Sequence, residues 1–193
     1  MPNLDIEQTY RYETIAGIDE VGRGALAGPV VVGAVIISAA LHPLDHAIND
    51  SKKLTKIKRN TLNTHILANH VCGIGSASVY EINQYGIVKA VNFAITRAIS
   101  SLNAKPTLLL IDGNDKFNLD TKYLSIINGD AKSTSIAAAS IIAKVYRDKL
   151  MQGLAMQYTP YGWHTNVGYG TKEHLEAVKQ HGRCQEHRNW AFG

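Results

Sequence analysis

Short apolar runs and helical stripes alternate along this chain. The apolar runs predict strands at 15–19, 30–37, 73–79, 107–111 and 123–127. The first two flank a glycine-rich stretch at 22–29, and this arrangement predicts a hairpin. The run at 107–111 is unbroken and leads into Asp-Gly-Asn, which is typical of a fully buried parallel strand and its exit turn.

Apolar residues at helical spacing lie between and after these runs. They predict helices at 51–68, 87–102, 133–150 and 172–180, with Ser51 as the N-cap of the first. The alanines of the third favour helix and allow close packing. A hairpin and a third strand, followed by strands that alternate with helices, predict an α/β fold in which helices cover a mixed sheet.

Composition places the chain among ordinary globular proteins. Its 193 residues suffice for one domain, with 45% hydrophobic and 19% charged residues. Cys72 and Cys184 lie far apart without metal-binding spacing, which argues against a zinc ribbon or a redox pair. No apolar run approaches the roughly 18 residues of a membrane span, and the start resembles no secretory leader, so we expect a cytoplasmic protein without membrane association.

The formal net charge of +4 hints at an anionic partner. Its distribution is more informative, because five basic residues fall within eight positions: Lys52, Lys53, Lys56, Lys58 and Arg59. If these side chains share a face, they suit contact with phosphate groups. A solvated helix face explains the same pattern.

Three carboxylates stand where apolar strands end. Asp19 and Glu20 end the first run, and Asp112 follows the run at 107–111. An uncompensated carboxylate at a sheet end costs on the order of several kcal/mol, so it needs a base, backbone donors or a cation. If the two strands are parallel neighbours, Asp19 and Asp112 meet where open α/β sheets build sites. Like charges this close repel strongly without a metal.

The cluster offers oxygen ligands alone, which favours Mg²⁺ or Mn²⁺ over zinc and implies phosphoryl chemistry. The alternative is that Asp19 and Asp112 merely cap turns. Strand alternation turns Glu20 to the face opposite Asp19. Both can therefore reach one ion only if the strand bends, which Gly22 permits.

The glycine-rich stretch also matches GxGxxA, a weak form of the dinucleotide-binding fingerprint. Such a loop must open a helix, whereas here Gly28, Pro29 and a β-branched run follow at once. We interpret the stretch as a tight turn whose amides approach a sugar-phosphate backbone, with Arg23 as an anion partner. A plain hairpin loop is the alternative.

Five segments resemble, in order and spacing, the ribonuclease HII family, the type 2 ribonucleases H. They are Ile18 to Gly24 with the following Leu26 to Val30, Asp50 to Leu54, Ile111 to Gly113, Gly129 to Asp148, and Gly168 to Thr171. The resemblance spans nearly the whole chain. It implies a ribonuclease H-like mixed five-stranded sheet flanked by helices. Residues 1–157 would form the catalytic domain, and residues 158–193 a small C-terminal helical extension that completes the substrate-binding site.

The resemblance also implies an activity, the cleavage of RNA hybridised to DNA and of single ribonucleotides embedded in duplex DNA. The family's four acidic positions fall on Asp19, Glu20, Asp112 and Asp130. This implies that they hold two divalent cations for in-line attack by water, leaving 3′-hydroxyl and 5′-phosphate ends. Asp148 is a rival for the fourth position. It follows Lys144 by four residues on one helix, so an ion pair within the helix explains it as well.

Substrate contacts follow from the same resemblance. Backbone groups of Gly22, Arg23 and Gly24 grip the 2′-hydroxyl, which distinguishes RNA from DNA, and Tyr169 stacks on the adjoining deoxyribose. Further candidates for phosphate contact are Lys52, Lys53, Lys132, Ser140 and Lys144. Without the resemblance, Tyr169 is interpreted as a surface loop residue. The eight histidines form no HExxH or comparable cluster, which indicates packing or surface roles.

Two other functions are compatible with these residues. Another nuclease of the same broad fold, such as a junction resolvase, carries carboxylate pairs at sheet ends but does not require a 2′-hydroxyl. A non-catalytic nucleic-acid binding module would use the acids structurally and the basic stretch for phosphate. We expect a monomer that acts on RNA–DNA hybrids and on duplex DNA containing ribonucleotides.

Overall fold

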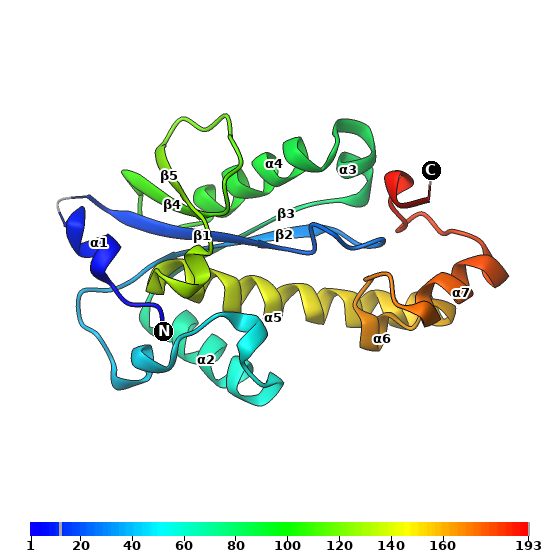
Figure 1. Ribbon diagram of the computed structural model, residues 1–193, viewed down its shortest axis with the longest axis horizontal. Coiled ribbons are helices and arrows are strands. Elements are labelled where there is room, and N and C mark those ends of the chain that lie inside the picture. The colour runs from blue at the N-terminus through cyan, green and yellow to red at the C-terminus, as the bar shows by residue number, and fades with distance from the viewer. Residues whose placement is uncertain (12, 193) are drawn as a thin grey trace.

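The computed structural model describes residues 1–11 and 13–192, and its centre is a five-stranded sheet in the order β3-β2-β1-β4-β5 (Figure 1). The strands are β1 (Ile15–Val21), β2 (Val30–Ile36), β3 (Val71–Ala77), β4 (Leu108–Asp112) and β5 (Lys122–Ile126). The first three pair antiparallel, whereas β4 runs parallel to β1 and β5 parallel to β4. The mixed five-stranded sheet predicted from the sequence is therefore confirmed.

Helices cover both faces of this sheet (Figure 1). They are α1 (Asp5–Thr9), α2 (Lys56–Asn69), α3 (Val79–Tyr85), α4 (Ile87–Ser100), α5 (Thr134–Gln157), α6 (Trp163–Asn166) and α7 (Lys172–His181). One face packs against α4 and the other against α5, with α2 packed on α5. The two main apolar clusters thus lie on opposite sides of one sheet.

The helix α5 approaches the sheet closely because small residues face it. A Cβ atom at Gly17 would lie 2.1 Å from the carbonyl carbon of Ser135. One at Gly33 would lie 2.3 Å from the carbonyl oxygen of Ala139. This packing holds the N-terminal half of α5 against the end of β1, where Asp19 lies.

The chain after α5 forms a smaller apolar cluster at the far end of that helix (Figure 1). Its buried members are Ala27, Met151, Tyr161, Trp163 and Ala177. Because Ala27 belongs to the connection between β1 and β2, the C-terminal segment packs directly on the glycine-rich turn. The backbone N–H groups of Leu26 and Ala27 donate to the carbonyl of Gly168 at 2.8 and 3.1 Å.

The predicted N-cap of α2 is wrong. Thr55 caps this helix, since its hydroxyl accepts from the N–H of Lys58. Ser51 instead opens a short 3₁₀ turn (Ser51–Lys53) that is capped by Asp50. Capping residues four positions apart compete for one helix start, and apolar periodicity does not distinguish them.

Other element boundaries also differ from the predicted ones. Ser78 and Glu81 form a capping box that starts α3, a helix that the sequence analysis did not predict, so β3 ends earlier than expected. The short α1 was not predicted either. The helix α5 continues to Gln157 instead of ending at Leu150.

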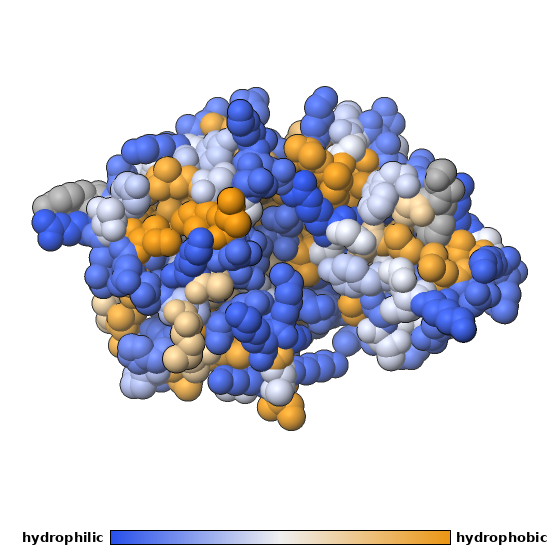
Figure 2. All heavy atoms as spheres, viewed as in Figure 1, coloured by the Kyte–Doolittle hydropathy of each residue, from blue (hydrophilic) through white to orange (hydrophobic). Residues whose placement is uncertain are grey.

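Hydrophilic residues predominate on the face shown in Figure 2, and apolar residues there form separate patches. Among the exposed apolar side chains, Ile57 belongs to α2 and Met156 to the end of α5. Within the described residues, no helix is both long and apolar enough to cross a membrane.

Candidate active site

Three of the four predicted acidic residues converge at the carboxyl ends of β1 and β4. The parallel register pairs Ile18 with Ile111, which places Asp19 beside Asp112 one residue later. Asp130 joins them from a 3₁₀ turn (Gly129–Ala131) that precedes α5. One carboxylate oxygen from each of the three aspartates lies within 4.8 Å of the others. The condition under which Asp19 and Asp112 were expected to meet, a parallel pairing of the two strands, is thus fulfilled.

The turn that carries Asp130 is hydrogen-bonded to Asp112. The N–H of Gly129 donates to Asp112 Oδ1 at 2.6 Å, and Asn128 turns the chain in the left-handed conformation at φ 55°. A second attachment, not predicted from the sequence, joins α1 to the start of α5. Glu7 Oε1 accepts from the N–H of Ser135 at 3.0 Å and from its hydroxyl at 2.8 Å. The first contact holds the carboxylate of Asp112, and the second fixes the start of α5 next to the turn that carries Asp130.

Burial and mutual repulsion act on these acids in the same direction. Burial, followed by the charges of Glu20 and Asp112, raises the pKa of Asp19 well above its ordinary value. Burial, followed by the charges of Asp50 and Asp112, raises the pKa of Asp130. The carboxylates therefore resist being ionised together unless a cation shares the site. An all-oxygen donor set with this excess of negative charge fits a hard divalent cation such as Mg²⁺ or Mn²⁺.

Glu20 lies outside this group of oxygens, as strand alternation predicts. Its carboxylate is 3.3 Å from Arg23 Nη1, and Arg23 also forms an ion pair with Asp115. Burial raises the pKa of Glu20, Arg23 opposes this shift, and Asp112 adds repulsion. Glu20 is therefore near enough to interact with Asp112 from the other face of the sheet. The guanidinium predicted as an anion partner is engaged by two carboxylates.

Ser140 and Lys144, two predicted substrate contacts on α5, have protein partners. The buried Oγ of Ser140 lies 2.8 Å from that of Ser51, and a hydrogen bond from Ser140 lowers the pKa of Asp19 against the larger effect of burial. Lys144 Nζ donates to Asp148 Oδ1 at 2.8 Å. The ion pair within the helix that was the alternative role for Asp148 is confirmed, and Asp148 lies outside the group of three aspartates.

The basic stretch after Asp50 divides into two parts. Lys52, Lys53, Lys56 and Lys58 are exposed, as is Lys132. Arg59 turns inward and donates to the carbonyls of Ser51 and Leu54 at 3.0 and 2.9 Å. Lys52 Nζ approaches the carboxylate of Asp130 to 4.0 Å. One predicted phosphate contact thus lies at the edge of the acidic group.

Tyr169 lies beside the glycine-rich turn, where both its ring and its backbone have partners. The guanidinium carbon of the buried Arg147 is 5.4 Å from the ring centroid. Trp163 Nε1 donates to His174 Nε2 at 3.0 Å, so the ring proton of neutral His174 is on Nδ1. His174 Nδ1 then donates to the carbonyl of Tyr169 at 2.9 Å.

A second histidine extends this chain of hydrogen bonds. His187 Nδ1 accepts from the N–H of Cys184 at 3.0 Å, and His187 Nε2 lies 3.1 Å from His174 Nε2. Burial, with a smaller contribution from His174, lowers the pKa of His187 to about 4. Burial also lowers the pKa of His174. No feature of the sequence distinguished His174 from the other histidines, whereas in the structure it connects the C-terminal segment to Tyr169.

The pKa of His187 predicts a loss of stability in acid. The unfolded chain binds a proton near the ordinary value of 6.5, whereas the folded chain binds it near 4. The free energy of unfolding should therefore fall as the pH drops from 6.5 towards 4. In denaturant unfolding of His187→Gln across this range, the free energy of unfolding should depend less steeply on pH than it does in the parent chain. The matched control is His164→Gln, which removes an exposed histidine, and equal slopes for both variants would contradict the assignment.

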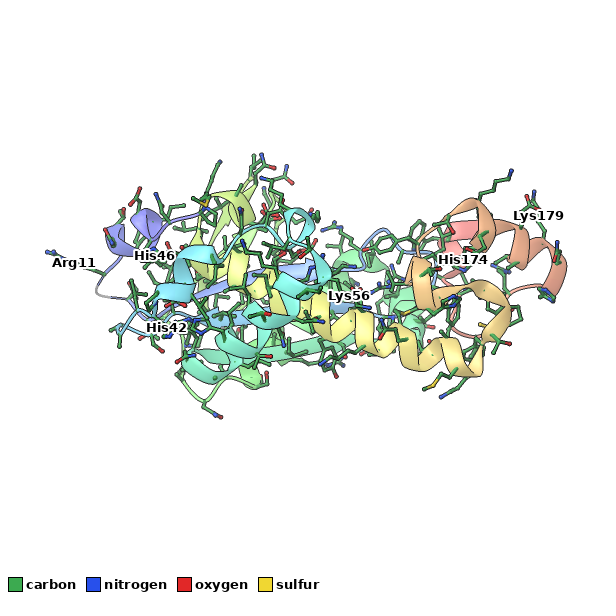
Figure 3. The ribbon with its side chains drawn as sticks, turned by 90° about the horizontal axis from the view of Figure 1, so that it is seen from below. Arg11, His42, His46, Lys56, His174 and Lys179 are labelled. Atoms are coloured by element: carbon green, nitrogen blue, oxygen red, sulfur yellow. The ribbon has the colours of Figure 1, made fainter. Side chains whose placement is uncertain are left out.

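A second histidine group lies far from Tyr169. Figure 3 shows His42 and His46 near one end of the molecule and His174 near the other. Close to His42, the buried side chains of Asp45, His65 and His70 come together. These histidines therefore gather in space although no sequence spacing marks them, and their burial agrees with the packing role expected from the sequence. Asp45 belongs to the loop after β2 and the histidines to the end of α2, and only folding joins them.

Hydrogen bonds explain this second group without a cation. His65 Nε2 and His70 Nε2 lie 2.7 and 2.9 Å from Asp45 Oδ1. The N–H of Ser38 donates to His70 Nδ1 at 3.2 Å, and Asn69 Nδ2 lies 3.1 Å from His65 Nδ1. A neutral imidazole that accepts at Nδ1 carries its proton on Nε2. Both histidines therefore donate to Asp45 and fasten the loop to α2.

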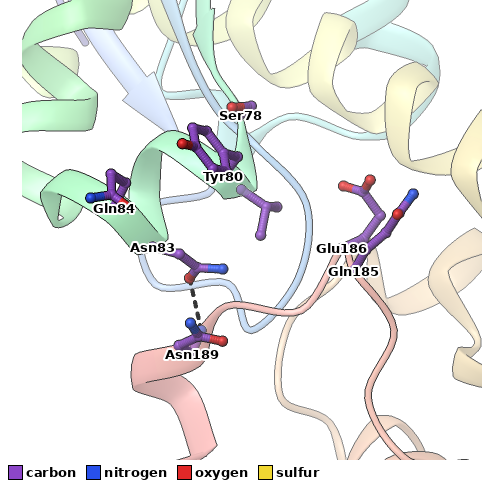
Figure 4. Close-up of a pocket in the computed structure, with 8 residues that line it drawn as sticks. Ser78, Tyr80, Asn83, Gln84, Gln185, Glu186 and Asn189 are labelled. Atoms are coloured by element: carbon purple, nitrogen blue, oxygen red, sulfur yellow. Dashed lines mark hydrogen bonds between the residues drawn. The ribbon is translucent and has the colours of Figure 1, made fainter.

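A cavity of about 500 Å³ lies between α3 and the C-terminal segment, away from the carboxylates. Figure 4 shows Tyr80 and Gln84 on one side of it and Gln185 and Glu186 on the other. The N–H of Asn189 donates to the side-chain oxygen of Asn83 at 2.8 Å. The acidic group does not line this cavity, so the cavity is separate from the candidate active site.

Comparison with known proteins shows which family this chain resembles. The profile of the Ribonuclease HII family matches residues 16–191. Ribonuclease HII of Orientia tsutsugamushi (strain Ikeda) is 49% identical over 187 residues, which cover 97% of this chain and 90% of that protein. Ribonuclease HII of Rickettsia akari (strain Hartford) is 49% identical, covering 96% of this chain and 94% of the relative.

Solved structures agree on the fold. Ribonuclease H2 from Pyrococcus horikoshii superimposes with a TM-score of 0.73 at 27% identity, over 91% of this chain and 92% of that one. The chain in the PCNA:RNase HII complex from Archaeoglobus fulgidus gives a TM-score of 0.77 at 24% identity, over 91% and 94% of the two chains. With a family profile across nearly its whole length and relatives of almost half-identical sequence, this chain belongs to the ribonuclease HII family of metal-dependent endoribonucleases.

Proposed function

We propose that this protein cleaves the RNA strand of RNA–DNA hybrids and single ribonucleotides embedded in duplex DNA, leaving 3′-hydroxyl and 5′-phosphate ends. One observation carries the proposal. Asp19, Asp112 and Asp130 bring carboxylate oxygens within 4.8 Å of one another at the ends of parallel strands. Family membership supports the same chemistry, since ribonucleases H act on RNA paired with DNA.

Two divalent cations, Mg²⁺ or Mn²⁺, are proposed as cofactors, held by Asp19, Glu20, Asp112 and Asp130. When bound, such ions activate water and stabilise the departing 3′-oxygen. The protein itself orients these ligands. Gly129 fixes one oxygen of Asp112, and Ser140 lowers the pKa of Asp19 against the larger effect of burial. The raised pKa of Asp19 predicts that cation binding displaces a proton, so cation affinity should fall as the pH is lowered.

Recognition of the ribonucleotide is assigned to the turn at Gly22, Arg23 and Gly24 and to Tyr169. Gly24 is exposed, and a Cβ atom built there would meet no atom within 4 Å. A sugar can therefore approach this backbone closely. The 2′-hydroxyl is the group that this turn must detect. The exposed Lys52, Lys53 and Lys132, with Lys144, are proposed to contact phosphates, and residues 158–193 to complete the site as part of a monomer.

The decisive test is cleavage of an end-labelled DNA duplex that contains one ribonucleotide. We expect a single cut at the ribonucleotide in MgCl₂ or MnCl₂, no cut in EDTA, and no cut in the all-DNA duplex of the same sequence. Sequencing-gel mobility and phosphatase treatment of the products identify the new ends. Equal cleavage of the all-DNA duplex, or undiminished cleavage in EDTA, would overturn the proposal.

A further inference from the structure

Two buried arginines bind the inner side of the glycine-rich turn. Arg188 Nη1 donates to the carbonyl of Arg23 at 2.8 Å, and its Nε and Nη2 donate to the carbonyl of Gly28 at 3.0 and 2.8 Å. Arg147 donates to the carbonyls of Ala27 and Pro29 at 3.1 and 3.0 Å. Both arginine side chains are fully buried. The turn is thus held through its carbonyl oxygens.

Neither guanidinium has a carboxylate partner within ion-pair distance among the described residues. Burial, with a smaller contribution from the neighbouring Arg147, lowers the pKa of Arg188 to about 9. A buried cation that is neutralised only by carbonyl dipoles costs stability. Leucine or methionine would avoid the buried charge but leave the carbonyls of Arg23 and Gly28 without these donors, so the reason for an arginine here lies in how it holds the turn.

The geometry of the peptide unit supplies that reason. In a planar trans peptide, the C=O of one residue and the N–H of the next point in opposite directions. Because the carbonyl of Arg23 points inward to Arg188, the N–H of Gly24 points outward. Within the described part of the chain, no acceptor is recorded for that N–H, and Gly24 is exposed.

We infer that Arg188 is a positioning residue for ribonucleotide recognition, which aims the Gly24 amide at the 2′-hydroxyl of the substrate. This inference rests on the proposed function. Arg188 itself touches no substrate, because its side chain is fully buried beneath the turn. It acts by preventing rotation of the Arg23–Gly24 peptide, which would present a carbonyl oxygen to the substrate in place of the amide.

The test is the ratio of affinities for two duplexes, measured in the cleavage-deficient Asp112→Asn background. One duplex contains a single ribonucleotide, and the other is the all-DNA duplex of the same sequence. Arg188→Lys keeps the charge but offers an ammonium group that cannot span the carbonyls of Arg23 and Gly28. We expect the preference for the ribonucleotide to fall by about tenfold, the contribution of one hydrogen bond, with unchanged affinity for all-DNA duplex.

Two comparison variants separate this role from a merely structural one. Arg147→Lys weakens contacts with the same turn but leaves the Arg23–Gly24 peptide held, so it should change both affinities together and preserve the ratio. Arg97→Lys serves as the remote control, because Arg97 holds the carbonyl of Ser76 at 2.7 Å elsewhere in the fold. Parallel loss of both affinities in Arg188→Lys, or an unchanged ratio, would refute the inference.

If Arg188→Lys does not fold, the parent chain still provides the test. The ¹⁵N–¹H signal of Gly24 should shift with the ribonucleotide duplex and remain nearly unchanged with the all-DNA duplex. Equal shifts with both would refute the inference. A parent chain that shows no preference for the ribonucleotide duplex would refute the proposed function instead, so the two failures are distinguishable.

Discussion

Replacing Asp112 by Asn should reduce cleavage of the ribonucleotide-containing duplex by on the order of 10³-fold, because one ligand of the cation site loses its charge. Asn retains an oxygen that can accept the N–H of Gly129, now at 2.6 Å from Asp112 Oδ1. The fold should therefore be kept. Repulsion of Asp19 also decreases, so the thermal stability without cation should not fall. Single-turnover cleavage and thermal melts with and without MgCl₂ measure both effects.

The matched control for this variant is Asp120→Asn. Asp120 is exposed in the connection that follows Asp112 between β4 and β5, and it lies outside the group of three aspartates. The Asp120→Asn variant should cleave at the rate of the parent chain. It should also keep any thermal stabilisation by MgCl₂, whereas Asp112→Asn should lose it. Cleavage by Asp112→Asn within tenfold of the parent rate would contradict a role of Asp112 in holding a cation.

Replacing Gly24 by Ala should reduce cleavage by roughly 10²-fold without loss of stability, because the added methyl group separates the turn from the sugar. The free protein has room for it, since a Cβ atom at Gly24 would meet nothing within 4 Å. Its φ is also not in the left-handed region. Cleavage kinetics and thermal unfolding of the same preparation distinguish substrate exclusion from misfolding.

The comparison variant is Gly22→Ala, which should behave in the opposite way. Gly22 has φ +86°, and a Cβ atom there would lie 2.0 Å from Arg147 Nε. Since Arg147 is held by three carbonyls, it cannot move aside freely. We expect a loss of about 2–5 kcal/mol in the free energy of unfolding. A stable Gly22→Ala, or a fully active Gly24→Ala, would contradict this division of roles within one turn.

Local pattern predicted most of the fold. The runs that became β1, β2 and β4 are almost wholly apolar, and α4 carries a continuous apolar stripe, so their types were clear. The misplaced start of α2 arose where Ser51 and Thr55 were both plausible caps. The helix α3 was missed because it is short and begins directly after a strand.

The candidate site was predictable to the extent that its residues end strands. Asp19 and Asp112 stand out because charge at the end of a buried strand needs compensation. Asp130 was assigned only through the family resemblance, and its position beside them depends on the turn before α5. The histidine groups were missed entirely, since Asp45 and His70 are 25 positions apart and share no periodic pattern.

By itself, the sequence determined the elements and the two carboxylates that end neighbouring strands, because periodicity and charge placement are properties of consecutive residues. The tertiary structure alone decided which groups hold the glycine-rich turn. Arg188 donates to the carbonyl of Arg23, 165 positions away. His174 donates to the carbonyl of Tyr169 because the hydrogen bond from Trp163 fixes its ring proton on Nδ1. Such contacts arise when segments distant in sequence pack together. They follow no regular spacing along the chain, so a single sequence does not reveal them.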